Sequence, residues 1–324
     1  MNSYNSQSSP VQSSPVQSVI IPTYNRKDML AEAIDSVLKQ TQKSLEVIVI
    51  DDCSTDGTEE YVKSIPDERV HYYRNEKNSG QEYSRNFGLR HSQGKYITFI
   101  DDDDYYTDYD FFTKAIKIFE EHDSINAPLS FVYANAELVN IETGNVNIWE
   151  IGQPGRVKGI DYILSPDYHK PPSTFPTVFK AQALRQAGLE NMIIFDTETY
   201  IQAALEGDGW LMPGIIGVYR EHKQSTTLGY KNHPAQNKRL HAKVIAMAER
   251  NKLIAEKICA LTDKKKAAEW CMRSAHLLMV CYRGQQNYIN ELRTYGKAML
   301  IMSKFNHKIM IMLPLDRKST RLNS

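Results

Sequence analysis

Three polar clusters lie directly after short apolar segments in the first third of the chain, and their side chains could do chemistry together. Asp101 to Asp104 form a run of four aspartates after KYITFI. Adjacent carboxylates repel one another at neutral pH, and a hard divalent cation neutralises them while it keeps positions open for phosphate oxygens. An isolated acidic run is more often a solvated loop, but its place after an apolar strand favours a site for Mg²⁺ or Mn²⁺ and a diphosphate.

The other two clusters could recognise a base. Asp51 and Asp52 follow LEVIVI, and Thr23-Tyr24-Asn25 follows SVIIP. A carboxylate after the second segment could accept a hydrogen bond from a base N–H, and Tyr24 could stack on the same base. On these residues alone, a turn that begins at Asp51 and a core position for Tyr24 are equally good interpretations.

The elements that must position these clusters alternate between strand and helix. Near-continuous apolar segments predict strands, and residues between them recur at helical spacing. This pattern is typical of an α/β fold with a mainly parallel sheet and helices on both faces, in which ligands bind beyond the carboxyl ends of strands. All three clusters would then converge on one edge. Asn25 could cap the helix that follows the first strand. The predicted strands are 18–22, 45–50, 70–73, 95–100 and, later in the chain, 130–134.

Length and composition exclude several classes of protein. The chain has 324 residues, of which 41% are hydrophobic, so it can bury a real core and is not mostly disordered, collagen-like or a small disulfide scaffold. We expect no membrane span, because no apolar run reaches 18 residues, and no secretion signal. The four cysteines lack CxxC spacing and are interpreted as reduced cytosolic thiols.

The net charge of zero hides a division of the chain. Residues 1–230 carry a net charge of −13, and residues 231–324 carry +13. We therefore predict a disordered tail over 1–17, an α/β domain over 18–230 and a basic helical region over 231–316. Residues 317–324 break all periodicity and are interpreted as a frayed or non-native end.

The basic region has more than one interpretation. Its apolar faces are expected to pack on the α/β domain, with the lysines solvated. Lys264 to Lys266 and the stretch 297–313 also suit peripheral contact with an anionic membrane surface, or an anionic acceptor glycan. Nucleic acid is not an expected partner, because no recognition motif accompanies the charge.

Several motifs, taken in order, resemble those of family 2 glycosyltransferases of the GT-A fold. Their order and spacing match from about residue 18 to 105 and more loosely to about 228, with Cys53 where small residues are usual. The matching segments are VIIPTYNR (19–26), VIDDCSTDGT (49–58), NSG (78–80), SRN (84–86), GKYI (94–97) and FIDDDD (99–104), the last of which resembles the DXD motif.

The resemblance implies a nucleotide-sugar site. The base, usually uracil, would be lined by Pro22, Thr23, Tyr24 and Asp52. Arg85 would lie near the nucleotide, and Asp101 would face the ribose or a metal-bound water. Asp103 would bind Mn²⁺ or Mg²⁺ directly. Asp102 occupies the variable middle place of the motif and is grouped with the nucleotide-binding residues, where its charge is unusual.

The resemblance also implies a catalytic base at the start of a helix that a glycine closes. Asp196 to Gly207 fits this layout, although Phe195 replaces the acid that usually precedes the base, which makes Glu198 a rival. Chemically, a carboxylate must take the proton of the acceptor hydroxyl; the simpler interpretation is that Asp196 caps the helix. His222, in a segment that resembles the closing motif, is a further candidate beside the diphosphate or metal, or a structural histidine.

These observations and the resemblance predict a glycosyltransferase that moves a sugar from a nucleotide donor to a hydroxyl of a glycan or lipid-linked acceptor, and the resemblance implies inversion and favours UDP. The resemblance implies bacterial surface polysaccharide synthesis, in the cytoplasm or peripherally at the inner face of the membrane. One alternative is a nucleotidyltransferase, but PTYN is not the Gly-rich loop such enzymes carry. Another is a degenerate nucleotide- or glycan-binding protein, for which Phe195 is the support.

Overall fold

The computed structural model describes residues 14–164, 171, 173–191, 196–223, 249, 251–263, 265–271 and 274. The strands are β1 (Gln17–Thr23), β2 (Leu45–Asp51), β3 (Val70–Arg74), β4 (Tyr96–Phe99), β5 (Tyr105–Tyr106), β6 (Leu129–Asn140), β7 (Val146–Trp149), β8 (Gly155–Val157), β9 (Thr177–Lys180) and β10 (Asp208–Glu221). The helices are α1 (Lys27–Leu38), α2 (Thr58–Lys63), α3 (Gln81–His91), α4 (Phe111–Ser124), α5 (Gly159–Leu164), α6 (Ala181–Gln186) and α7 (Asp196–Glu206), with a 3₁₀ turn, η1 (Leu189–Asn191).

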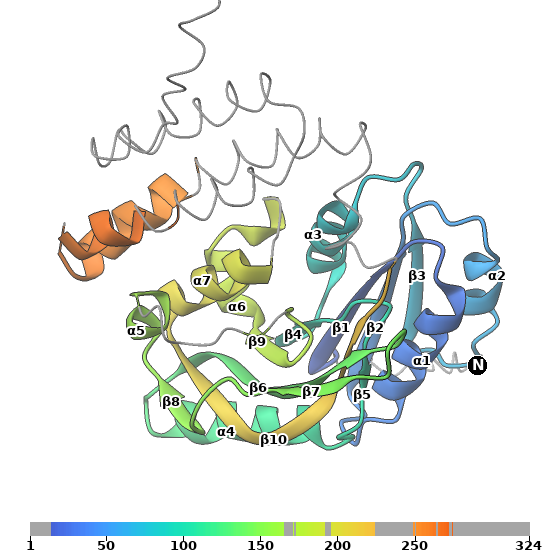
Figure 1. The fold of residues 1–324 in the computed structure, drawn as a ribbon, viewed down its shortest axis with the longest axis horizontal. Coiled ribbons are helices and arrows are strands. Elements are labelled where there is room, and N and C mark those ends of the chain that lie inside the picture. Colours follow the sequence, from blue (N-terminus) through green and yellow to red (C-terminus); the bar gives the residue numbers. More distant parts are fainter. Residues whose placement is uncertain are drawn as a thin grey trace, which may run out of the picture.

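The strands form one mixed sheet in the order β3-β2-β1-β4-β9-β6-β10-β5 (Figure 1). The first four strands run parallel, and the register places Thr23 beside Asp51. The carboxyl ends of β1, β2 and β4 therefore meet at one edge, as the sequence predicted. The second half of the sheet adds antiparallel pairs of β9 with β4 and with β6, and the parallel pair β6–β10.

The two faces of the sheet carry separate cores, because successive strand residues point to opposite sides. In β1, Val19 and Ile21 pack with α1, α2 and α4, whereas Ile20 packs with α3 and with α5 to α7. Figure 1 shows the sheet between these two sets of helices. The runs of Val and Ile in β1 and β2 are buried throughout, as expected for parallel strands that are covered on both faces.

The structure confirms the predicted α/β class and corrects local details. The predicted strand at 130–134 extends to Asn140, where the chain turns back into β7. We expected Asn25 to cap α1, but the N-cap position is Arg26, and Asn25 has a positive φ of 54°. The Asn25 side chain instead accepts a hydrogen bond from the Thr55 amide in the loop after β2.

Part of the basic region contributes to the core. Ile254, Ile258 and Trp270 belong to the same buried cluster as Tyr162 of α5 and Tyr200 of α7. Lys257 forms an ion pair with Glu206 at the end of α7, at 3.1 Å. Packing against the α/β domain is therefore confirmed for this part. Residues 1–13, Lys264, the stretch 297–313 and the end at 317–324 lie outside the described residues.

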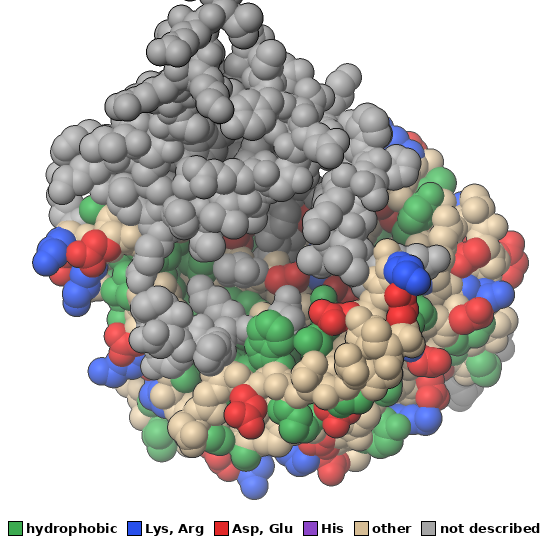
Figure 2. All heavy atoms as spheres, in the orientation of Figure 1, with side chains coloured by type: hydrophobic (Ala, Val, Ile, Leu, Met, Phe, Trp, Pro, Cys, Tyr) green, Lys and Arg blue, Asp and Glu red, His purple; other side chains and the backbone are tan. Residues whose placement is uncertain are grey.

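No helix within the described ranges is long and apolar enough to cross a membrane. On the face drawn in Figure 2, the acidic and basic side chains of the described residues are interspersed.

Candidate functional site

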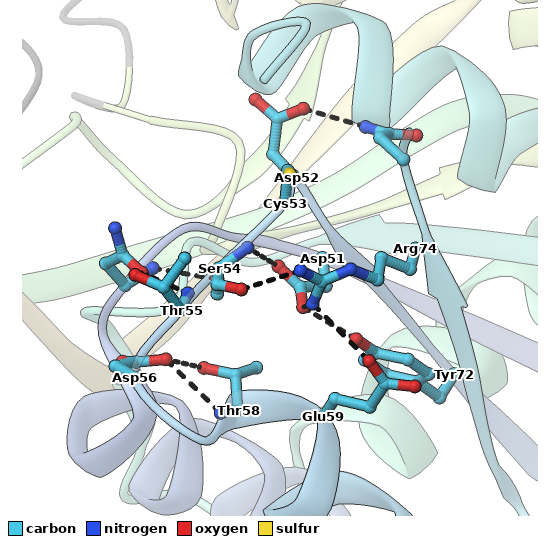
Figure 3. Close-up of polar contacts among 12 residues, drawn as sticks. Asp51, Asp52, Cys53, Ser54, Thr55, Asp56, Thr58, Glu59, Tyr72 and Arg74 are labelled. Carbon is cyan, nitrogen blue, oxygen red and sulfur yellow. Dashed lines mark hydrogen bonds and ion pairs between the residues drawn. The ribbon is translucent and has the colours of Figure 1, made fainter. Parts of the chain in front are cut away.

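The carboxylate of Asp51, at the end of β2, is enclosed by protein donors. Its Oδ1 accepts the Ser54 amide at 2.7 Å, and its Oδ2 accepts the Tyr72 hydroxyl at 2.6 Å and Arg74 Nη1 at 2.9 Å (Figure 3). Asp51 is fully buried, and both oxygens are used. It therefore ties the loop after β2 to β3, and it takes the structural role that the sequence left open.

Asp52 points away from Asp51 (Figure 3). Its Oδ1 accepts the Asn75 side-chain amide at 2.8 Å and the Ser79 amide at 2.7 Å, and its Oδ2 accepts the Gly80 amide at 2.7 Å. Gly80 has a φ of 95°, which favours glycine, and it precedes α3. The expected base-binding residue thus also holds the loop that leads into α3. Pro22 and Thr23 are buried at the end of β1, whereas Tyr24 is 47% exposed, as a stacking surface would need to be.

One arginine at the N-cap of α1 contacts both middle aspartates of the run. Arg26 Nη1 lies 2.8 Å from Asp102 Oδ1 and 2.9 Å from Asp103 Oδ2. Asp102 Oδ2 also accepts the Thr23 hydroxyl at 2.8 Å. Burial, together with the nearby Asp103 charge, raises the pKa of Asp102 to about 6, although Arg26 opposes the shift. The unusual charge at the middle position therefore has a partner within the protein.

His222 lies beside the aspartate run. Its Nε2 is 3.0 Å from Asp103 Oδ2. Burial opposes ionisation of Asp103, but the His222 hydrogen bond and the Arg26 charge outweigh it and lower the pKa of Asp103. Asp103 is thus held as a carboxylate through Oδ2.

The candidate base is connected to the aspartate run through Arg85 on α3. Arg85 Nη2 lies 2.6 Å from Asp101 Oδ1, and Nη1 lies 2.5 Å from Asp196 Oδ1. The Asp196 side chain is 33% exposed, whereas the rival Glu198 is buried at 3%. A ligand can reach Asp196 more easily than Glu198, so exposure favours Asp196 as the candidate base.

Asp104 is the fully buried end of the run. Its Oδ1 accepts the Arg220 amide at 3.0 Å, whereas its Oδ2 is buried without a hydrogen-bond partner among the described residues. Burial and the charges of Asp103 and Asp101 raise the pKa of Asp104 well above its usual value. Such a group is costly unless something else neutralises it.

This arrangement fits a divalent cation. Asp101, Asp103 and Asp104 each offer an oxygen, and these oxygens lie within 4.8 Å of one another. Hard cations such as Mg²⁺ and Mn²⁺ prefer carboxylate oxygens. The orphaned oxygen of Asp104 is the observation that supports the fit. Asp102 is outside this group, because Thr23 and Arg26 engage both of its oxygens.

Our sequence interpretation missed four contributors. Arg26 was quoted within a motif but given no role, and Asp104 was not separated from its neighbours. Gln81 Nε2 donates to Asp101 Oδ1, and Thr174 Oγ1 lies 3.2 Å from Asp196 Oδ1. A basic residue after a strand end and a fourth aspartate could have drawn attention. The contact of Thr174 with Asp196 could not be predicted, because it depends on the tertiary structure and no local sequence pattern indicates it.

Comparisons with known proteins agree with this geometry. Residues 18–175 match the model of "Glycosyl transferase family 2". The chain is 44% identical over 92 residues to a putative teichuronic acid biosynthesis glycosyltransferase, TuaG, of Bacillus subtilis, covering 28% of this chain and 36% of that protein. It is 40% identical over 89 residues to WfaP of Escherichia coli, a UDP-Glc:alpha-D-GlcNAc-diphosphoundecaprenol beta-1,3-glucosyltransferase, again covering 28% and 36%.

A solved structure shares the fold. S. aureus TarS 1-349 in complex with UDP-GlcNAc matches with a TM-score of 0.68 and 19% identity, over 90% of this chain and 82% of that one. The fold is that of this GT-A glycosyltransferase, and residues 18–175 form a domain that matches glycosyl transferase family 2. The matched segments span well under half of the two curated relatives described above.

Proposed function

We propose that this chain is an inverting glycosyltransferase that moves a sugar from a UDP-sugar to a hydroxyl of a glycan or lipid-linked acceptor. One observation carries the proposal: Asp196, a partly exposed carboxylate, lies one guanidinium group away from Asp101 of the aspartate run. A proton acceptor and a site for a charged leaving group are thus held side by side. Donor and acceptor could meet between them.

The reaction would be a direct displacement. The acceptor oxygen forms a bond to the anomeric carbon of the sugar, and the bond between that carbon and the diphosphate oxygen breaks. The nucleoside diphosphate leaves with the electron pair, and the hydroxyl proton passes to the Asp196 carboxylate. Attack from the face opposite the leaving group inverts the anomeric centre. Tyr24 would stack on the base, and Asp52 has room for one further donor, such as a base N–H.

Asp101, Asp103 and Asp104 would hold Mn²⁺ or Mg²⁺, and Asp103 is oriented for this by His222 and Arg26. When bound, the cation would supply positive charge next to the diphosphate. The protein residues would hold the donor in register with Asp196, and the buried position of the run limits competing water.

The donor and acceptor classes follow the names of similar proteins. WfaP is named for UDP-glucose and a diphosphoundecaprenol-linked acceptor, and TarS is described in complex with UDP-GlcNAc. We extend this to a UDP-sugar donor and a lipid-linked acceptor in surface polysaccharide synthesis. Contact of the basic region with an anionic membrane would suit such an acceptor, and sedimentation with anionic vesicles at physiological salt tests it.

The proposal is tested by assaying transfer from UDP-glucose, UDP-galactose, UDP-GlcNAc and UDP-GalNAc to a short-chain prenyl-diphosphate GlcNAc, with Mn²⁺ or with EDTA. We expect UDP release and a glycosylated product with at least one donor, only with the cation, and loss of turnover in Asp196→Asn. UDP binding without turnover for any donor would instead favour the degenerate binding protein. Full activity of Asp196→Asn would contradict the role of Asp196.

A further inference from the structure

Arg85 is a buried cation that links two carboxylates from distant parts of the sequence. Its side chain is 4% exposed, and each Nη atom contacts a different aspartate, Asp101 after β4 and Asp196 at the start of α7. Burial alone would lower the pKa of Arg85, but the two carboxylates outweigh it and raise that pKa above its usual value. The guanidinium therefore stays charged and fixed between them.

The contacts of Asp196 are one-sided. Arg85 Nη1 at 2.5 Å and the Thr174 hydroxyl at 3.2 Å both fall on Oδ1. Within the described ranges, no hydrogen bond is recorded on Oδ2, and the side chain is 33% exposed. A carboxylate anchored through one oxygen presents the other in a defined direction.

The position of Arg85 is itself fixed by the packing of its helix and by a neighbouring side chain. It lies on α3, which packs on β1 and β2, and Gln81, one turn earlier on the same helix, donates to the same oxygen of Asp101. Both Nη atoms are used on carboxylates, and Nε is buried. The sequence interpretation placed Arg85 beside the nucleotide, but this burial leaves little of its surface for a ligand.

We propose that Arg85 is a positioning residue for proton transfer: it fixes Asp196 through Oδ1 against Asp101, so that Oδ2 faces the acceptor hydroxyl. This rests on the proposed function. As the acceptor oxygen bonds to the anomeric carbon and the diphosphate leaves with the electron pair, the hydroxyl proton passes to Asp196 Oδ2. Displacement of a reacting group by about 1 Å can cost roughly 100-fold in rate, so the anchor matters.

The test compares Arg85→Gln and Arg85→Lys with Arg74→Gln as a matched control. Arg74 likewise pairs with a buried aspartate at a strand end, 2.9 Å from Asp51, but it has no recorded contact with Asp196. Three quantities are measured: the Kd of UDP with Mn²⁺ by calorimetry, kcat and KM for transfer, and amide exchange of the α7 segment without substrates.

For Arg85→Gln we expect kcat to fall about 100-fold, and the Kd of UDP to change less than about threefold. Arg85→Lys should recover part of kcat, because its ammonium can reach one carboxylate. In an Asp196→Asn background, Arg85→Gln should change kcat by less than about threefold, because residues that act as a unit are not additive. Arg74→Gln should leave kcat within about twofold of wild type, since it lies outside this unit.

Two results would overturn the proposal. The first is a loss of UDP affinity in Arg85→Gln that matches the loss of kcat/KM while kcat stays unchanged, which would make Arg85 a nucleotide-binding residue. The second is an additive effect in the Asp196→Asn background. If the wild-type protein transfers no sugar, the proposed function fails. The amide-exchange measurement then still tests whether Arg85 anchors α7: Arg85→Gln must speed exchange in α7, and Arg74→Gln must not.

Discussion

The carboxylates at the ends of β2 and β4 differ in how far the protein satisfies them. Asp51 and Asp52 accept six hydrogen bonds from backbone and side-chain donors, and each of their four oxygens is used. At the end of β4, the four aspartates are contacted by Arg26, Arg85, His222, Thr23, Gln81 and the Arg220 amide, but Asp104 Oδ2 has no hydrogen-bond partner among the described residues.

The difference distinguishes carboxylates that hold the structure together from carboxylates that are available to bind a ligand. A carboxylate whose two oxygens both accept hydrogen bonds from protein donors fixes a loop, and its ionised form is stable without a ligand. In a crowded group of buried carboxylates with an unpartnered oxygen, the ionised form is costly unless another positive charge is present. In the proposed function, the end of β2 would shape the base-binding side, and the end of β4 would hold a cation and a diphosphate.

The largest effect is expected from Asp196→Asn. Asp196 is connected to the aspartates at the end of β4, because Arg85 contacts both Asp196 and Asp101. Transfer should fall by roughly 100-fold to 10,000-fold, because the proposed general base is lost. Affinity for UDP with Mn²⁺ should stay close to wild type, since the substitution leaves the aspartate run intact. Initial rates and calorimetry measure the two quantities, and a parallel loss of both would place Asp196 in donor binding.

At the end of β2, Asp51→Asn should lower the free energy of unfolding. The substitution removes the charge that Tyr72 and Arg74 contact, and hydrogen bonds to charged groups contribute about 1.5–3 kcal/mol, so we expect a loss of about 2 kcal/mol. Urea unfolding at pH 7.5 measures it. Stabilisation by UDP with Mn²⁺ should persist. If Asp51→Asn has normal stability but is no longer stabilised by UDP with Mn²⁺, the proposed difference between the ends of β2 and β4 is wrong.

A finer comparison sets Asp104→Asn against Asp102→Asn within the run. The asparagine at 104 keeps an oxygen for the Arg220 amide but removes the orphaned charge, so stability without cation should hold or rise by about 1 kcal/mol. Mn²⁺ affinity should fall roughly tenfold or more. Asp102→Asn should lower Mn²⁺ affinity less and stability more, because Thr23 and Arg26 lose the charge of the Asp102 carboxylate. The reverse ranking in a calorimetric Mn²⁺ titration would exclude Asp104 from the cation site.

The sequence predicted the parallel half of the sheet well, because buried strands of Val and Ile and the polar residues after them are local signals. It also brought Asp101 and Asp196 into one site, through the resemblance. It could not distinguish Asp51 from Asp52, or Asp102 from Asp104, because neighbouring aspartates look alike until their partners are known. Those partners lie far along the chain: Asp104 meets Arg220, and Asp196 meets Arg85 and Thr174.

The antiparallel half was harder to predict for a similar reason. β9 is short and pairs with β4 and β6, which are remote in sequence, and β10 carries register shifts against β6. Asn25 illustrates a conflict between local and tertiary preference. Its type favours a helix cap, but its side chain binds the Thr55 amide instead. Tertiary contact decided these positions.

The most direct test of the central claim is a thermal-unfolding comparison of the wild-type protein and Asp103→Asn with UDP, with Mn²⁺ and with both; GDP, dTDP and CMP serve as controls. A ligand that binds the native state raises Tm by mass action. We predict a rise of several degrees for the wild type only with UDP and Mn²⁺ together, and its loss in Asp103→Asn. An equal rise without Mn²⁺ or in Asp103→Asn, or no rise with any nucleotide, would contradict a cation-dependent nucleotide site at the end of β4.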